Sequence, residues 1–269
     1  MGMKTLGEDI IEHFLFCQTH DDLLFFTDSG KVFKIPAYEI PEGTRVAKGR
    51  GLLNFLELSP EDKILSILPF EKEDKNNKEN QGNKMKYLVM ATKNGMIKKT
   101  DLDEFENVRK SGLIAINLKK GDLLKAVKRT SGEDEVILVT KKGQSIRFKE
   151  KDVRPMGRTA AGVMGIRLKK GDEVVGMDVI KLKVKNEKLK VKDYLLVVSE
   201  NGYGKRTDLK EYRLQTRGGS GIKTANITDK TGDLVASKVL SGEEEDLIVI
   251  SQKGQIIRTP INSISVISR

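Results

Sequence analysis

The stretch DDLLFFTDSGKVFKIP (21–36) decides the fold, because the chain repeats its pattern five times. An apolar run leads to a turn that ends in Gly, and a second apolar run then carries a cation. The other copies are KYLVMATKNGMIKKT (86–100), DEVILVTKKGQSIRF (134–148), DYLLVVSENGYGKRT (193–207) and EDLIVISQKGQIIRTP (245–260). Such a turn between apolar, β-prone runs is typical of a β-hairpin, with Gly at the position that needs a positive φ. The sequence therefore predicts five hairpins, each with a cation just past its turn.

The spacing of the copies indicates a radial array of small sheets. The turn glycines Gly30, Gly95, Gly143, Gly202 and Gly254 are separated by 65, 48, 59 and 52 residues. Each hairpin is followed by a basic, glycine-bearing segment and a second pair of apolar runs. A unit of about four strands and about fifty residues is typical of a propeller blade. The alternative, a β-solenoid, has shorter coils than this period.

These repeats predict an all-β, β-propeller-like domain that spans residues 1–269. The expected blades are 21–85, 86–133, 134–192 and 193–244, flanked by half blades at 2–20 and 245–269. Pairing of the two halves would close the ring and remove exposed strand edges. Two polar inserts interrupt the array: 71–84 is expected to be a disordered loop, and 181–192 a protruding basic hairpin.

The charge balance favours an anionic partner. Lys and Arg total 49 against 39 for Asp and Glu, a net charge of +10. Nucleic acid is the first partner that such a surplus suggests and acidic lipid the second, while a merely solvated basic surface is the alternative. Aromatic residues are few and Trp is absent, so stacking on single-stranded bases is poorly supplied. Duplex backbone binding matches the composition better.

Other chemistry finds little support in the residues. Cys17 is the only cysteine, which excludes an internal disulfide, and its apolar neighbours 14–17 suggest a packed thiol. His13 and His20 are the only histidines, and structural or surface roles are expected for them. No phosphate-binding Gly-Lys-Thr loop is present, so no cofactor is expected in this chain. Without a long apolar run or a signal peptide, the chain is expected to be cytoplasmic, with no membrane partner.

Each whole unit carries an Arg followed, three or four residues later, by Gly. These Arg-Gly loops lie within 44–51, 109–112, 158–162 and 215–221. Arg supplies bidentate, charge-assisted contacts to phosphate, and Gly lets a backbone approach closely. For the glycines alone, turn shaping is the favoured interpretation. For the arginines, their recurrence at equivalent places favours phosphate binding.

These residues also carry a family resemblance that covers essentially the whole chain. The stretches 19–51, 130–139, 142–168 and 201–222 resemble the C-terminal domain of the DNA gyrase A subunit, part of a type IIA topoisomerase. The resemblance implies a β-pinwheel of about five to six four-stranded blades, whose basic rim wraps duplex DNA with positive handedness. It also implies a domain that is not an enzyme in isolation. The partners would be the gyrase A N-terminal domain and the gyrase B subunit, which use ATP and Mg for negative supercoiling.

The chain departs from the family pattern at its most specific motif. The box Gln-Arg-Arg-Gly-Gly-Lys-Gly is absent, and the chain begins just downstream of its expected place. The nearest echo is Gln215–Gly221, in which Thr and Ser replace two of the cations. The strands that precede the box and the close of the last unit are also missing.

The predicted DNA path follows the post-turn cations and the Arg-Gly loops around the rim. The expected contacts are Lys31, Lys34, Arg45, Lys48, Arg50, Lys98, Lys99, Arg109, Lys110, Arg147, Arg154, Arg158, Lys205, Arg206, Arg217, Gly218, Gly219 and Arg258. No device for reading bases is visible, so sequence-tolerant binding to bendable duplex is expected.

Two alternatives remain open. The C-terminal domain of the topoisomerase IV A subunit has a similar blade design with degenerate boxes. A protein-binding propeller of the WD40 or kelch type belongs to another class. Its Trp-Asp and Gly-His signatures are absent from this chain.

Overall fold

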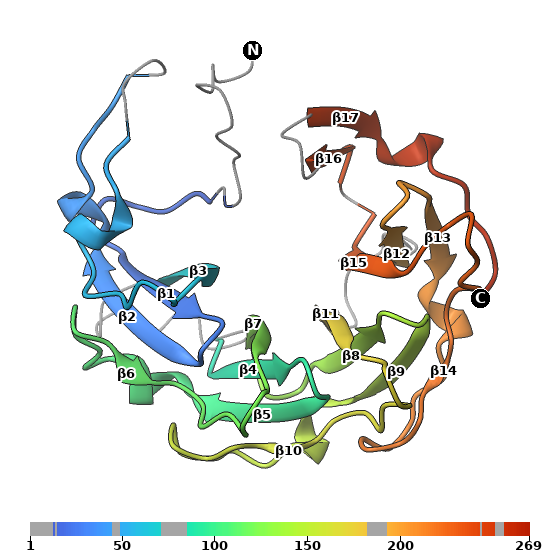
Figure 1. Cartoon of the computed structure of the whole chain (residues 1–269), viewed down its shortest axis with the longest axis horizontal. Helices are drawn as coiled ribbons and strands as arrows, with labels where there is room; N and C mark the ends of the chain where they lie inside the picture. Colours follow the sequence, from blue (N-terminus) through green and yellow to red (C-terminus); the bar gives the residue numbers. More distant parts are fainter. Residues whose placement is uncertain are drawn as a thin grey trace, which may run out of the picture.

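The fold is a row of small antiparallel sheets that curves into an arc (Figure 1). The structure is a computed structural model and describes residues 13, 15–44, 49–70, 85–181, 193–242, 244–250 and 256–269. The expected all-β, propeller-like class is confirmed. The strands are β1 Asp22–Thr27, β2 Lys31–Pro36, β3 Ile64–Phe70, β4 Tyr87–Thr92, β5 Met96–Asp101, β6 Leu113–Ile114, β7 Leu124–Thr130, β8 Glu135–Thr140, β9 Gln144–Lys149, β10 Val163–Met164, β11 Val174–Ile180, β12 Tyr194–Ser199, β13 Gly204–Asp208, β14 Ile222–Lys223, β15 Leu234–Leu240, β16 Asp246–Ile250 and β17 Ile256–Pro260. Short 3₁₀ turns η1 Ala37–Glu39, η2 Leu52–Asn54, η4 Leu102–Phe105, η5 Glu150–Asp152, η6 Leu209–Glu211 and η7 Ile261–Ser263 lie between them.

The predicted hairpins are present, and their turn glycines have the expected conformation. Gly30 and Gly95 have a φ of 83°, and Gly143 and Gly202 have a φ of 79°. Residue 254, the fifth turn glycine, lies outside the described residues. Only Gly adopts this left-handed region at little cost, which fixes the turn between the two strands of each hairpin.

The fourth strand of each complete sheet comes from the next repeat. The strand orders are β3-β1-β2-β6, β10-β5-β4-β7 and β11-β8-β9-β14, followed by a three-stranded sheet β13-β12-β15 and the pair β16-β17. Strands β6, β10 and β14 lie on the outer side of the arc (Figure 1). The sequence units 21–85, 86–133 and 134–192 therefore do not coincide with the sheets, although four strands per blade is correct for the first three. Each unit reaches back to cover the outer edge of the blade before it.

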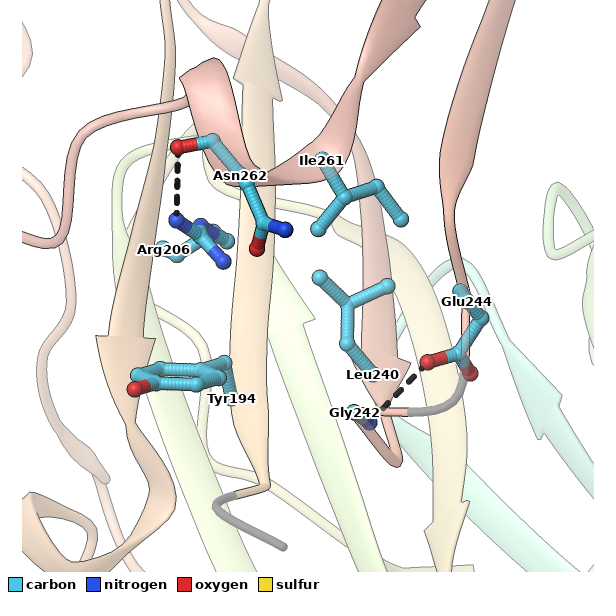
Figure 2. A pocket seen from close by; sticks show the side chains of 7 residues that line it. All are labelled: Tyr194, Arg206, Leu240, Gly242, Glu244, Ile261 and Asn262. Atoms are coloured by element: carbon cyan, nitrogen blue, oxygen red, sulfur yellow. Dashed lines mark hydrogen bonds between the residues drawn. The ribbon is translucent and has the colours of Figure 1, made fainter.

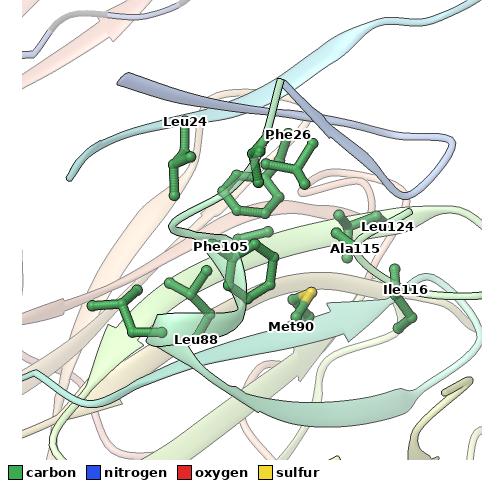
Figure 3. Packing of buried hydrophobic residues seen from close by; sticks show 12 residues of the cluster. Leu24, Phe26, Leu88, Met90, Phe105, Ala115, Ile116 and Leu124 are labelled. Atoms are coloured by element: carbon green, nitrogen blue, oxygen red, sulfur yellow. The ribbon is translucent and has the colours of Figure 1, made fainter. Parts of the chain in front are cut away.

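Neighbouring blades share their hydrophobic cores. Leu24 and Phe26 of β1 pack with Leu88 and Met90 of β4 in one buried cluster, shown in Figure 3. The rings of Phe26 and Phe105 meet edge to face, with centroids 6.1 Å apart. Buried aromatic pairs of this geometry add to the stabilisation that area burial provides. A blade therefore buries one of its apolar faces against its neighbour, as in other repeat proteins.

The last hairpin, β16–β17, lies at one end of the arc (Figure 1). It pairs with no third strand among the described residues, and Ile248, Ile256 and Ile257 stay exposed. Residues 1–12 and 14 lie outside the described part, so pairing of the two half blades stays a prediction. The inserts at 71–84 and 182–192 lie outside it as well.

The cysteine and the histidines lie at the surface. Cys17 is exposed, so the expected packed thiol is wrong: residues 15–18 form no strand, and Phe16 beside it is 84% exposed. His13 is exposed, with Nε2 3.3 Å from the carbonyl oxygen of Ile64, and His20 is exposed too. Within the described residues, no cluster of three or more potential metal ligands occurs. None of the helices described there is long and apolar enough to cross a membrane.

Candidate nucleic-acid interface

The post-turn cations occupy one repeat position and have matched partners. Each lies four residues after its turn glycine, and its partner, an acid or a tyrosine, lies eight residues before that glycine. The pairs are Lys34 with Asp22, Lys99 with Tyr87, Arg147 with Glu135, Arg206 with Tyr194, and Arg258 with Asp246. The two strands of the hairpin bring each pair together, because the antiparallel register places the partners diagonally across the ladder.

Arg147 shows what this position does. Its Nη2 lies 2.6 Å from Oε2 of Glu135, within its own hairpin. Its Nη1 donates to the carbonyl oxygens of Leu209 at 2.9 Å and Tyr212 at 3.2 Å, which belong to the next unit. The guanidinium therefore connects two blades, and its donors are directed into the junction.

Arg206 repeats this arrangement one blade further on. Its guanidinium lies 5.3 Å from the ring centroid of Tyr194. It donates to the carbonyl oxygens of Ile264 at 2.9 Å and Asn262 at 3.3 Å. Figure 2 shows this group in a pocket between the last two hairpins, which Leu240 and Glu244 also line.

The two lysines at this position also contact groups of their own hairpin and of the next unit. Nζ of Lys99 lies 3.7 Å from Oε1 of buried Glu150 and 4.8 Å from the ring centroid of Tyr87. Nζ of Lys34 lies 3.3 Å from Asp22 and donates to the carbonyl oxygen of Glu106 in the next unit. Lys34, Lys99, Arg147 and Arg206 therefore make contacts at the blade junctions, and their contact with DNA stays a prediction. Arg258 differs, since its side chain is 73% exposed while it pairs with Asp246.

Three other predicted lysines also make intramolecular contacts. Lys98 is fully buried and donates to the carbonyl oxygens of Ala115 at 2.7 Å and Arg158. Burial lowers the pKa of Lys98 to about 8. Nζ of Lys205 donates to the carbonyl oxygen of Ser268 at 2.6 Å, and burial lowers its pKa as well. Lys31 pairs with Asp62 at 3.0 Å beside the first hairpin turn.

The loop glycines serve the blade contact. Gly162 has a φ of +85°, and a Cβ there would lie 2.6 Å from the carbonyl oxygen of Ile97 on the preceding blade. The amide of Gly218 donates to Gly165 at 2.6 Å, and the carbonyl of Gly219 accepts from the amide of Arg167. The Gly218 amide and the Gly219 carbonyl are therefore occupied within the protein. The turn-shaping interpretation fits the glycines.

The exposed cations gather on the segments that cross from one blade to the outer edge of the preceding one. We call residues 101–114, 149–164 and 208–223 the rim segments. Arg154 and Arg213 lie on two of them, each eleven residues after its turn glycine, and both are exposed. Neither forms an ion pair or a side-chain hydrogen bond within the described part of the chain.

Sequence reasoning found Arg154 but missed Arg213 and its neighbours. Lys151 and Lys210 are also exposed and share a repeat position, eight residues after their turn glycines. Comparison of the residues at a fixed distance from each turn glycine is the signal that would have identified them. The Arg-Gly pattern does not include these positions, because no glycine lies within four residues after them.

Some of the remaining predicted residues have exposed side chains, and others make ion pairs or hydrogen bonds within the protein. Arg50 and Arg109 are exposed, and Lys110 is exposed while it pairs with Glu39. Arg158 is half-buried, with Nε 3.6 Å from Glu104. Arg217 donates from Nε to the carbonyl of Asp152 at 2.8 Å, so part of its guanidinium is occupied. Residues 45 and 48 lie outside the described part of the chain.

The charge of the rim segments is uneven. Segment 101–114 carries four acids and two cations, whereas 149–164 and 208–223 each carry four cations and two acids. One of those acids, Glu150, is fully buried and accepts from Thr130 Oγ1 at 2.7 Å. Among these three segments, the positive charge is therefore concentrated on the two adjacent segments 149–164 and 208–223.

Comparisons with known proteins agree with this architecture. The family described as "DNA gyrase C-terminal domain, beta-propeller" matches residues 21–71, 86–131, 134–181, 193–241 and 245–269. The chain is 44% identical over 264 residues to the DNA gyrase A protein of Staphylococcus epidermidis, an alignment that covers 98% of this chain and 28% of that protein. The chain thus spans less than a third of the length of this relative.

Two solved structures have a similar fold. A C-terminal domain of DNA topoisomerase IV superimposes with a TM-score of 0.78 at 26% identity, covering 93% of this chain and 73% of that one. A DNA gyrase A C-terminal domain superimposes with a TM-score of 0.73 at 27% identity, covering 94% and 76%. The structural likeness alone does not separate the two enzymes, while the sequence match over the five repeats does name a family. This chain belongs to the family of DNA gyrase C-terminal domains.

Proposed function

We propose that this chain binds duplex DNA along rim segments 149–164 and 208–223 and bends it around the outer side of the arc. The observation that carries the proposal is the pair Arg154 and Arg213, exposed and uncommitted at the same position of adjacent blades. A guanidinium presents a fork of donors that matches phosphate geometry. Recurrence on successive blades suits a partner with regularly repeated phosphates.

The acidic segment 101–114 makes the path uneven. Asp101, Asp103, Glu104 and Glu106 are all exposed there, against Arg109 and Lys110. Phosphates are repelled by such a surface, so the duplex is held most tightly where the two cationic segments follow each other. Smooth bending of a 20–30 base-pair site by 40–90° costs about 1–6 kcal/mol, which the rim contacts must offset.

The wider role follows from the family. The chain covers 28% of the length of the gyrase A protein of Staphylococcus epidermidis, so the wider role depends on the rest of such a protein. We infer a non-catalytic domain that presents bent DNA to the gyrase A N-terminal domain and the gyrase B subunit. ATP and Mg would be used by those parts during negative supercoiling, and the site of action would be the cytoplasm.

Binding to a 40-base-pair duplex across a salt series tests the proposal. Each phosphate contact contributes about 0.9 to the slope of log affinity against log salt, so Arg154→Gln with Arg213→Gln should lower the slope by about 2. The matched control is Lys119→Gln with Lys120→Gln, which removes the same charge from exposed residues outside the rim segments. Binding that barely changes with salt, or equal loss in both double variants, would contradict the proposal.

A further inference from the structure

The second strand of each hairpin carries another repeat position, three residues after the turn glycine. It holds Phe33, Lys98, Ile146 and Lys205 in successive blades. In each case the side chain lies under the segment that the next unit lays over the blade edge: a Cβ on Gly112 would lie 2.5 Å from Phe33, and one on Gly162 would lie 3.2 Å from Cβ of Lys98. Of these four blades, two therefore use an apolar residue here, and two use a lysine.

The lysines donate hydrogen bonds to backbone carbonyls, which the apolar residues cannot do. Lys98 donates to the carbonyl oxygen of Arg158 in the rim segment above it and to Ala115 in its own unit. Lys205 donates in the same way to the carbonyl of Ser268. Buried lysines are rare because burial of the ammonium is unfavourable, so a lysine at a position that accepts Phe and Ile needs a reason.

Arg158 is held at both of its backbone groups. Its amide donates to Oε2 of Glu104 at 3.2 Å, and its carbonyl accepts from Lys98. Glu104 also lies 3.6 Å from Nε of Arg158. These contacts fix where the Arg158 side chain leaves the cationic segment 149–164, next to Glu104 of the acidic segment 101–114.

We propose that Lys98 is a positioning residue for DNA binding: its buried amino group fixes the backbone at Arg158 so that this rim segment is presented to the duplex in one shape. The inference rests on the proposed function. Lys98 itself touches no DNA, since it is fully buried. Lys205 makes a related contact on a later blade, with the carbonyl oxygen of Ser268.

We call the hydrogen bonds from Lys98 to the carbonyl oxygens of Ala115 and Arg158 the clamp. The protonation state of Lys98 makes the strength of this clamp depend on pH. Two carbonyl acceptors match the two N–H donors of the neutral amine, and the third N–H of the ammonium has no further acceptor among the described groups. The charged groups that face Lys98 are Glu104, which favours the ammonium, and Arg158, which disfavours it. Because burial lowers its pKa to about 8, an open segment with hydrated Lys98 binds the proton more tightly than the closed one. Protonation thus favours opening, and the clamp tightens as pH rises through about 8.

The test compares Lys98→Met with the wild-type chain in binding to the 40-base-pair duplex. Blades with Phe33 and Ile146 show that an apolar residue is accepted, so the variant should fold, with a Tm close to that of the wild type. One phosphate contact at about 0.1 M salt corresponds to about an eightfold change in affinity, so a partial loss of about three- to eightfold is expected. Ile146→Met is the matched control at the same repeat position and should bind like the wild type.

Two further measurements separate positioning from general stability. In a double-mutant cycle with Arg158→Gln, the two losses should not add, because Lys98 acts through Arg158. The ratio of wild-type to Lys98→Met affinity should be larger at pH 9 than at pH 7. Wild-type affinity in Lys98→Met, additive losses or a pH-independent ratio would each overturn the inference. So would failure of both Lys98→Met and Lys98→Ile to fold, since the proposal assigns Lys98 to the segment and not to the blade. A wild-type chain that does not bind the duplex would overturn the proposed function itself.

Discussion

At the scale of single residues, two classes of cation lie a few positions apart and have opposite orientations. Arg147 donates into a blade junction, while Arg154 is exposed to solvent. Both were expected to contact DNA, since both are arginines in a basic repeat. The difference follows from the partners: Arg147 has Glu135 across the hairpin and two carbonyls of the next unit within reach. A regular series of cations therefore serves the stacking of the blades.

Arg147→Met should destabilise the protein while DNA contacts on the rim are unchanged. The substitution leaves the carboxylate of Glu135 and two carbonyls without their donor, and breaking such a buried pair costs about 3–5 kcal/mol. Because Arg147 remains partly exposed to water, about 2–3 kcal/mol is expected in urea unfolding. Arg154→Met, an exposed substitution, should change the free energy of unfolding by less than about 0.5 kcal/mol. Unchanged stability of Arg147→Met together with weaker DNA binding would show that the assignment is wrong.

At the scale of elements, the outer strands explain how separate repeats become one molecule. Strand β10 has only two residues, yet it pairs with β5 of the preceding blade and covers its edge. Gly162, just before β10, approaches that blade too closely for any side chain. The rim segments thus cover strand edges and display cations at once.

Gly162→Ala should loosen this attachment. Its φ of +85° and the carbonyl of Ile97 at 2.6 Å from a new Cβ combine backbone strain with a clash. Gly171→Ala is the control, because Gly171 has a φ of +77° but nothing within 4 Å. The left-handed conformation alone costs about 1–2 kcal/mol, so thermal or urea unfolding should show Gly162→Ala to be clearly the more destabilising of the two. Equal costs would mean that the close approach contributes nothing.

The hairpins were predictable from sequence because their signals are local. Apolar runs around Gly30 or Gly95 define both strands and the turn within about fifteen residues. The exchange of outer strands was not predictable, because the two residues of β10 have no periodicity. The orientation of a cation such as Arg147 depends on carbonyls more than sixty residues away, which no local pattern encodes.

At the scale of the whole molecule, the stacking of the blades and the proposed DNA binding use the same crossing segments. Shared cores and junction cations hold the sheets in an arc, and the rim segments lie on its outer side (Figure 1). A duplex that follows Arg154 and then Arg213 must bend with the arc. Wrapping, which the family resemblance implies, requires in addition that the bent path be chiral, and this chirality separates wrapping from simple bending.

Ligation of nicked circles in the presence of the chain tests this account most directly. Protein is added to relaxed, nicked DNA, the nick is sealed, and the linking number of the purified circles is measured. The account predicts a shift of the linking-number distribution that grows with the amount of protein and shrinks when Arg154 and Arg213 are both replaced by Gln. A distribution that stays unchanged while the DNA is saturated with protein would contradict chiral wrapping and leave only bending of the kind expected for a topoisomerase IV domain.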